Sequence, residues 1–203
     1  MANTNAPFGF KQYQGTGSSP TYEQVTAIAQ YNASAIYNGD PVTWQTDGTI
    51  ARSSSTGGTP ATLGIAGIFI GCKYLSVAQK RTVWSSYWPG SDVASGNYVE
   101  CYVVNDPNAK FVAQTDSTGC SIADVNGTVG FAIGTGNTNN GLSGAYVDMT
   151  TLNTSSYVAN NPFKIVGVIN DPPGVNGTLS NGQAYDQVIV SFNNVVTRNF
   201  QGV

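Results

Sequence analysis

The sequence predicts an all-β protein: a β-sandwich or β-barrel of jelly-roll type with an extended N-terminal arm. Short runs rich in Val, Ile, Tyr, Phe and Thr alternate with clusters of Gly, Pro, Asn and Asp along the chain, which is the spacing of a sandwich or barrel. No stretch keeps a helical period between capping residues. The hydrophobic fraction of 40% includes 3 Trp, 8 Phe and 11 Tyr, so the chain can bury a core, at about 25 cal/mol per Å².

Residues 1–20 are expected to form the arm. Gly, Asn, Ser and Thr predominate here around four apolar residues, Pro7, Phe8, Phe10 and Tyr13. The mixture is too apolar for a solvated tail and too interrupted by Gly and Pro for a regular strand. We therefore predict that residues 2–13 become ordered only against a neighbouring chain, with Phe8 and Phe10 as anchors. A disordered leader is the alternative interpretation.

Residues 21–203 are expected to form a single all-β domain with long contact loops. The run Leu63–Cys72 is apolar on both faces and should lie centrally in a sheet, where its glycines indicate bulges or close backbone approach. In Pro41–Thr46, Val42 and Trp44 share one face, as in a half-buried strand. The expected strands are Tyr22–Tyr31, Pro41–Thr46, Leu63–Cys72, Thr82–Tyr87, Tyr98–Asn105, Lys110–Thr115, Gly127–Ile133, Ala145–Thr150, Phe163–Asn170 and Tyr185–Phe192.

Three long polar stretches are expected to be the contact loops: Arg52–Pro60, Gly134–Gly144 and Leu152–Asn161. Loops of this length within a compact domain usually serve a function. Between other strands, turns are indicated by short Asn, Asp, Gly and Pro motifs such as Asn38-Gly39-Asp40-Pro41 and Asp47-Gly48.

Composition argues against catalysis. The chain has 0 His, and His is the usual residue for proton transfer near neutral pH and the commonest metal ligand. We expect no catalytic residue, no metal site and no cofactor, and the protein is not expected to be an enzyme. A carboxylate-dependent glycosidase is the enzymatic alternative, although the sequence gives no reason to pair any two carboxylates, and Asp residues beside Gly or Pro are explained by turn formation.

Charge and targeting signals narrow the expected partners. The formal net charge is −3, and the 8 Lys and Arg residues are scattered, so no nucleic-acid partner is expected. The N-terminus has no signal-peptide pattern, and no run approaches the roughly 20 apolar residues of a membrane span. Synthesis in the cytoplasm and no membrane partner are expected.

The cysteines are expected to be structural. Cys72, Cys101 and Cys120 are odd in number and form no Cys-x-x-Cys motif, so neither a disulfide framework nor a zinc site is indicated. Cys72 and Cys101 each lie in an apolar, strand-like run, which favours small buried core residues.

The most concentrated aromatic feature contains Trp84, Tyr87 and Trp88, directly before Pro89-Gly90. These side chains can pack in the core or between subunits, or they can be exposed and stack on sugar rings. Core or intersubunit packing is favoured, because Pro89-Gly90 ends the strand at once and no set of polar sugar-binding side chains is evident nearby.

Several motifs resemble those of tailed-phage capsid cement, or head-decoration, proteins. The resemblance covers most of the chain, and its motifs are structural rather than catalytic. They are Asn5-Ala6-Pro7-Phe8-Gly9-Phe10, Tyr37-Asn38-Gly39-Asp40-Pro41-Val42, the run Leu63–Cys72, Tyr87-Trp88-Pro89-Gly90, Val103-Val104-Asn105-Asp106-Pro107-Asn108 with Phe111, and Ile165-Val166-Gly167-Val168.

The resemblance implies a β-sandwich or β-barrel protomer on the outer surface of an icosahedral phage capsid. It would bridge neighbouring major capsid subunits, commonly as a homotrimer over local threefold positions, after synthesis in the host cytoplasm. The major capsid protein and further copies of this chain are the expected partners. The alternative function is a carbohydrate-binding module or phage adhesin that uses Trp84, Tyr87 and Trp88.

Overall fold

The computed structural model describes residues 3–14, 24–31, 34–53, 65–153, 161–169 and 182–193. These residues form β-strands joined by turns and two 3-10 turns, η1 (Ile122–Asp124) and η2 (Met149–Thr151), so the all-β prediction is confirmed. The strands are β1 (Lys11–Gln14), β2 (Gln24–Ala29), β3 (Pro41–Trp44), β4 (Ile50–Arg52), β5 (Gly67–Ser76), β6 (Arg81–Ser85), β7 (Val99–Val104), β8 (Lys110–Gln114), β9 (Thr128–Gly134), β10 (Gly144–Asp148), β11 (Phe163–Val168) and β12 (Gln187–Phe192).

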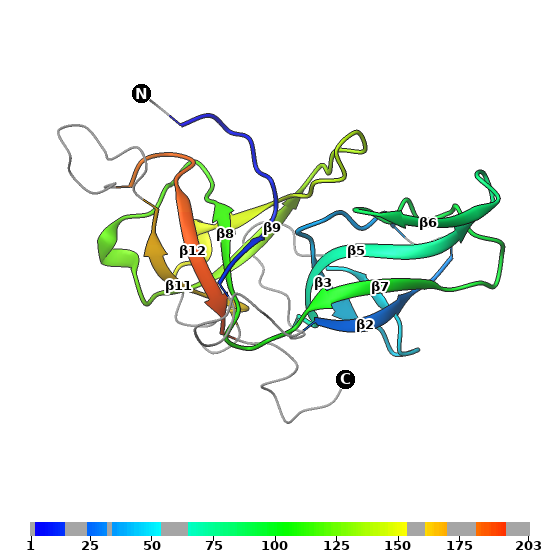
Figure 1. The fold of residues 1–203 in the computed structure, drawn as a ribbon. Helices are drawn as coiled ribbons and strands as arrows, with labels where there is room; N and C mark the ends of the chain where they lie inside the picture. Colours follow the sequence, from blue (N-terminus) through cyan, green and yellow to red (C-terminus); the bar gives the residue numbers. More distant parts are fainter. Residues whose placement is uncertain are drawn as a thin grey trace.

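The strands form two sheets that lie side by side as two lobes (Figure 1). In the first lobe the order is β1-β8-β12-β11-β9-β10, and a bridge between Thr115 and Val147 brings β10 back to the end of β8. In the second lobe the order is β3-β4-β2-β7-β5-β6, and β3 also pairs with β5. That pairing closes β2, β4, β3, β5 and β7 into a five-stranded barrel, with β6 as an additional outer strand.

Each lobe has its own hydrophobic core. The first core is rich in phenylalanine, with the rings of Phe10, Phe111, Phe131, Phe163 and Phe192 all buried. The second core lies inside the barrel and contains Ile, Val, Phe69, Trp88 and two cysteines. Both cores are made by alternate residues of neighbouring strands, because successive side chains of a strand point to opposite faces of its sheet.

Strand β5 is central, as its apolar sequence predicts. It pairs with β3, β6 and β7, and its register with β7 shifts between Phe69 and Gly71, which is a bulge. Gly67 has φ +152°, and a Cβ at this position would lie 2.3 Å from the Val104 carbonyl oxygen. A glycine is needed here because the backbones of β5 and β7 approach too closely for a side chain.

The turn at Asn38–Asp40 connects the two lobes. Its backbone bonds to both, since the Phe10 amide donates to the Gly39 carbonyl at 3.0 Å and the Gly39 amide donates to the Phe69 carbonyl at 2.8 Å. The hairpin between β9 and β10 bonds to the same turn, with the Asn38 amide donating to the Gly141 carbonyl at 2.9 Å. These bonds fix the lobes to one another.

The N-terminal segment is extended but packs on its own chain, which corrects the expectation that residues 2–13 become ordered only against a neighbour. Strand β1 pairs with β8, and Phe10 is 1% exposed within the first core. The Gln114 side chain accepts from the Ala6 amide and donates to the Thr4 carbonyl, both at 2.9 Å. Burial of the Phe10 ring, worth about 2 kcal/mol, compensates for the irregular sequence around it. Residues 15–20 of the expected arm lie outside the described residues.

Candidate binding surface on strands β5, β6 and β7

Strand β6 extends the sheet of the barrel beyond β5. Cross-strand partners place Lys73 of β5 opposite Trp84 of β6 and Glu100 of β7, and Gly71 opposite Tyr102. Directly opposed residues of antiparallel strands share a face. Trp84, Lys73, Glu100 and Tyr102 therefore project from the same outward face, while intervening residues point into the barrel.

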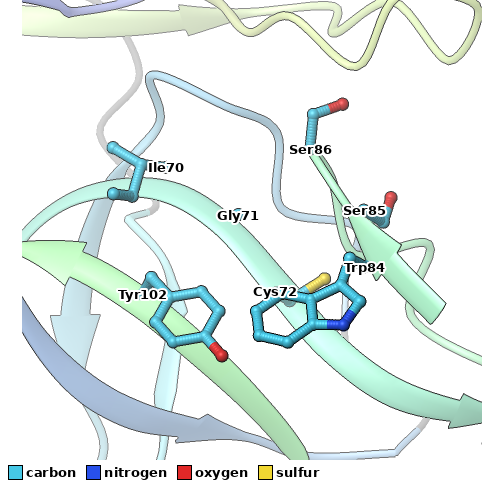
Figure 2. A pocket seen from close by; sticks show the side chains of 7 residues that line it. All are labelled: Ile70, Gly71, Cys72, Trp84, Ser85, Ser86 and Tyr102. Carbon is cyan, nitrogen blue, oxygen red and sulfur yellow. The ribbon is translucent and has the colours of Figure 1, made fainter. Parts of the chain in front are cut away.

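Two aromatic rings form a flat surface on this face, which we call the aromatic platform: the indole of Trp84 and the phenol ring of Tyr102. Their centroids lie 5.7 Å apart and their planes differ by 4°. Figure 2 shows both rings side by side with their faces turned the same way. Trp84 is 67% exposed, so much of its indole is accessible to a binding partner.

A pocket of about 580 Å³ adjoins the aromatic platform. Gly71 lies on its floor, between Tyr102 and the end of β6 (Figure 2), and its missing side chain leaves this part of the face hollow. The pocket is lined by Ile70, Gly71, Cys72, Trp84, Ser85, Ser86 and Tyr102.

A charged pair borders the aromatic platform. The Lys73 Nζ lies 3.8 Å from the Glu100 Oε2 and 5.1 Å from the centroid of the Trp84 ring. The Tyr102 hydroxyl donates to the Glu100 Oε1 at 2.9 Å. Partial desolvation and this hydrogen bond to Glu100 raise the pKa of Tyr102. The phenol therefore stays protonated and continues to donate its hydrogen bond to Glu100.

The three aromatic residues singled out in the sequence do not form a common surface. Trp84 is exposed, but Trp88 is 0% exposed and packs edge-on against Tyr74 in the barrel core, with centroids 5.0 Å apart. Tyr87 is half-buried and stacks on Tyr37 with centroids 5.4 Å apart. A sugar platform made of Trp84, Tyr87 and Trp88 is therefore excluded, and core packing is confirmed for Trp88.

Trp88 turns inward because its backbone leaves β6 and pairs elsewhere. Its amide donates to the Ile36 carbonyl at 2.8 Å, and the Ile36 amide donates to the Trp88 carbonyl at 2.9 Å. Sequence reasoning missed Tyr102, which takes the expected place beside Trp84. The available signal was the alternation in Tyr98–Asn105, where Glu100 and Tyr102 fall on one face and Cys101 and Val103 on the other.

The apolar residues of the N-terminal segment differ in accessibility. Phe10 belongs to the core and is not available to another chain. Pro7 and Phe8 are half-buried, and the Lys11 Nζ lies 5.8 Å from the centroid of the Phe8 ring. Tyr13 is 50% exposed on strand β1. Of the four residues proposed to contact a capsid, Pro7, Phe8 and Tyr13 retain an accessible surface.

All three cysteines are free and buried, as expected for Cys72 and Cys101. These two are cross-strand partners on β5 and β7. Burial raises the pKa of Cys101 and of Cys120 to about 12 and raises that of Cys72 further. The thiols are therefore protonated at neutral pH and act as small apolar groups.

Within the described ranges, no group of three or more His, Cys, Asp or Glu side chains is placed to hold a metal ion. The same residues contain no helix with the length and apolar character needed to cross a membrane. Comparison with protein-family models, with curated proteins and with solved structures found no match to this chain.

Proposed function

We propose that the protein is a structural virion protein that binds the outer surface of an icosahedral phage capsid and bridges neighbouring major capsid subunits. The motifs that resemble head-decoration proteins support this role. They include the N-terminal segment with Phe10, the turn at Asn38–Asp40 and strand β5. In the fold these segments meet at the junction of the two lobes, so the resemblance concerns the residues that define the architecture.

The observation that carries the proposal is the free edge of β1. This strand ends the first sheet, and among the described residues its strand partner is β8 alone. A sheet edge offers unpaired N–H and C=O groups to which another chain can add a strand. Tyr13 and Phe8 lie on and beside this edge, with Tyr13 50% exposed, and supply apolar contacts for a capsid subunit.

The edge of the second sheet supports a homotrimer on the capsid, because strand β6 ends the order of that sheet. Cyclic association hides exposed edges, and many identical contacts on a lattice add to a strong attachment. We expect three copies around a local threefold position. A clean monomer both in solution and on the capsid would contradict the trimer.

Cosedimentation with expanded capsids that lack this chain tests the proposal. Wild-type protein should saturate the capsids and raise their melting temperature, because binding only the assembled lattice stabilises it. The double variant Phe8→Ala/Tyr13→Ala should lower affinity about tenfold or more. Tyr98→Ala removes a ring that is 65% exposed on the other lobe and should bind as wild type.

The capsid role is rejected if wild-type protein does not cosediment, or if full occupancy leaves the melting temperature unchanged. If the double variant binds as well as Tyr98→Ala, the β1 edge is not the contact.

A further inference from the structure

The pocket between β5, β6 and β7 lies on the lobe that does not carry β1 (Figure 1). A capsid contact through β1 therefore leaves it free, and a trimer contact through the backbone edge of β6 leaves free the outward face from which Trp84 projects. We propose that this pocket binds a neutral saccharide, with the apolar face of a pyranose ring stacked on the aromatic platform. This inference goes beyond the capsid role and does not depend on it.

The indole of the aromatic platform is preorganised for binding. Trp84 is 67% exposed, yet its ring is flanked by the parallel ring of Tyr102 and by the Lys73 ammonium group at 5.1 Å. Both contacts favour one orientation of the indole. A ligand that stacks on a ring already held in place loses less binding energy to side-chain ordering.

The size and shape of the pocket suit a sugar ring or a short oligosaccharide. Its volume of about 580 Å³ lies within the range of roughly 300–1,000 Å³ for small-molecule sites. Gly71 provides the depth, since any larger residue opposite Tyr102 would project into the hollow. The pocket is open to solvent, so a chain of sugars can extend beyond it.

Hydrogen-bonding groups lie on two sides of the aromatic surface. Glu100 and Lys73 border one side, with their side chains 43% and 38% exposed, and the exposed hydroxyl of Ser86 lies on the other. A sugar hydroxyl both donates and accepts, so adjacent hydroxyls can bond a carboxylate and an ammonium together. Pyranoses combine such hydroxyls at the ring edge with C–H groups on the ring face.

The charge of the site favours a neutral sugar over nucleic acid. Among the described residues that line or border the pocket, Lys73 is the one cation, and Glu100 already lies 3.8 Å from it. Single-stranded nucleic acids also stack on aromatic rings, but they need a cationic groove for their phosphates.

A proline-rich peptide is the other ligand that binds parallel aromatic rings. Proline residues offer carbonyl acceptors and lack an N–H. Such a segment would offer the Glu100 carboxylate no donor beyond Tyr102 and Lys73, whereas a sugar hydroxyl would supply a further one.

The most suitable ligands are β-linked hexose chains with equatorial hydroxyls, because their ring faces carry C–H groups alone. Titration of ¹⁵N-labelled protein with cellohexaose and with N-acetylchitohexaose tests this. The 3 Trp residues give three indole N–H signals, and Trp84→Phe identifies that of Trp84. At least one oligosaccharide should shift the Trp84 signal and leave the Trp88 signal in place.

Variants then measure how much Trp84 and Glu100 each contribute to the affinity for the oligosaccharide. Trp84→Ala should weaken binding about tenfold or more, and Glu100→Gln should weaken it several-fold because a charged acceptor bonds more strongly than a neutral one. Tyr98→Ala, which removes another exposed ring (65% exposed), should not change the affinity. Thermal unfolding of each variant confirms that it is folded, which is expected because Trp84 lies outside both cores.

Three results would overturn the inference. One is that neither oligosaccharide shifts the Trp84 signal at millimolar concentration. Another is equal weakening by Trp84→Ala and Tyr98→Ala. The third is that decaproline binds in a Trp84-dependent manner while the oligosaccharides do not, which would assign the pocket to peptides. Capsid occupancy of Trp84→Ala is expected to equal that of wild type.

Discussion

The ring of Phe10 stacks on the ring of Phe163, with centroids 4.4 Å apart and planes 14° apart. Phe10 precedes β1 and Phe163 begins β11, so this contact joins the N-terminal segment to a strand near the other end of the chain. The ring of Phe131 packs edge-to-face with the ring of Phe10, with centroids 6.3 Å apart. The N-terminal segment thus completes the core of the first lobe.

We expect Phe10→Ala to lower the free energy of unfolding by about 3–5 kcal/mol, the usual cost of a buried Phe replaced by Ala. The ring is 1% exposed, whereas Tyr13 is 50% exposed. Tyr13→Ala is therefore the matched control, with an expected loss of about 1 kcal/mol or less. Urea unfolding followed by tryptophan fluorescence gives both values. Equal midpoints for the two variants would show that Phe10 does not stabilise the core.

The three thiols are expected to be unreactive in the folded protein. Thiol reagents attack the thiolate, and burial holds the pKa of Cys101 and Cys120 at about 12. Ellman's reagent at pH 8 should label none of them over several minutes in buffer and all 3 Cys in guanidinium chloride. Rapid labelling of the native protein would contradict the burial of at least one cysteine. Peptide mapping would identify it.

The sequence predicted the strands well because their alternation is local. Each of the ten expected strands overlaps an observed one, from β2 to β12. The two missed strands, β1 and β4, are too short for an alternating pattern to stand out, with sequences Lys-Gln-Tyr-Gln and Ile-Ala-Arg. They become strands through pairing with β8 and with β3, and such pairings do not follow from local pattern.

The candidate site could be predicted only in part. Trp84 was identified from composition, but its neighbour Tyr102 depends on the registers between β5, β6 and β7. The bulge between Phe69 and Gly71 shifts one of these registers, and a shift of one residue reverses which side chains share a face. For the same reason the sequence did not reveal that Phe10 belongs to the core, since its partners come from β9 and β11.

Asp40 is a buried carboxyl group at the junction of the lobes. It is 0% exposed, the Tyr37 amide donates to its Oδ2 at 2.8 Å, and the Ser143 hydroxyl donates to its Oδ1. Burial raises the pKa of Asp40, and the bonds from Ser143 and Tyr37 and the charge of Arg52 oppose this effect only in part. The folded protein therefore holds a proton on Asp40 more tightly than the unfolded chain does.

The contribution of Asp40 to stability should accordingly be greatest below the ordinary carboxyl pKa of about 4 and should decrease as pH rises through the higher folded value, by at most about 1.4 kcal/mol per pH unit. The Asp40→Asn variant cannot titrate at this position, so the difference between the free energy of unfolding of the wild type and that of the variant should fall as pH rises over this range.

Asp47 is an exposed control of opposite sign, because hydrogen bonds from Thr49 lower its pKa. Its contribution should instead be lost as pH falls. Urea titrations from pH 3 to pH 8 measure the difference in free energy of unfolding between the wild type and Asp40→Asn, and likewise between the wild type and Asp47→Asn. If the Asp40→Asn difference is flat or rises with pH, burial does not dominate the pKa of Asp40.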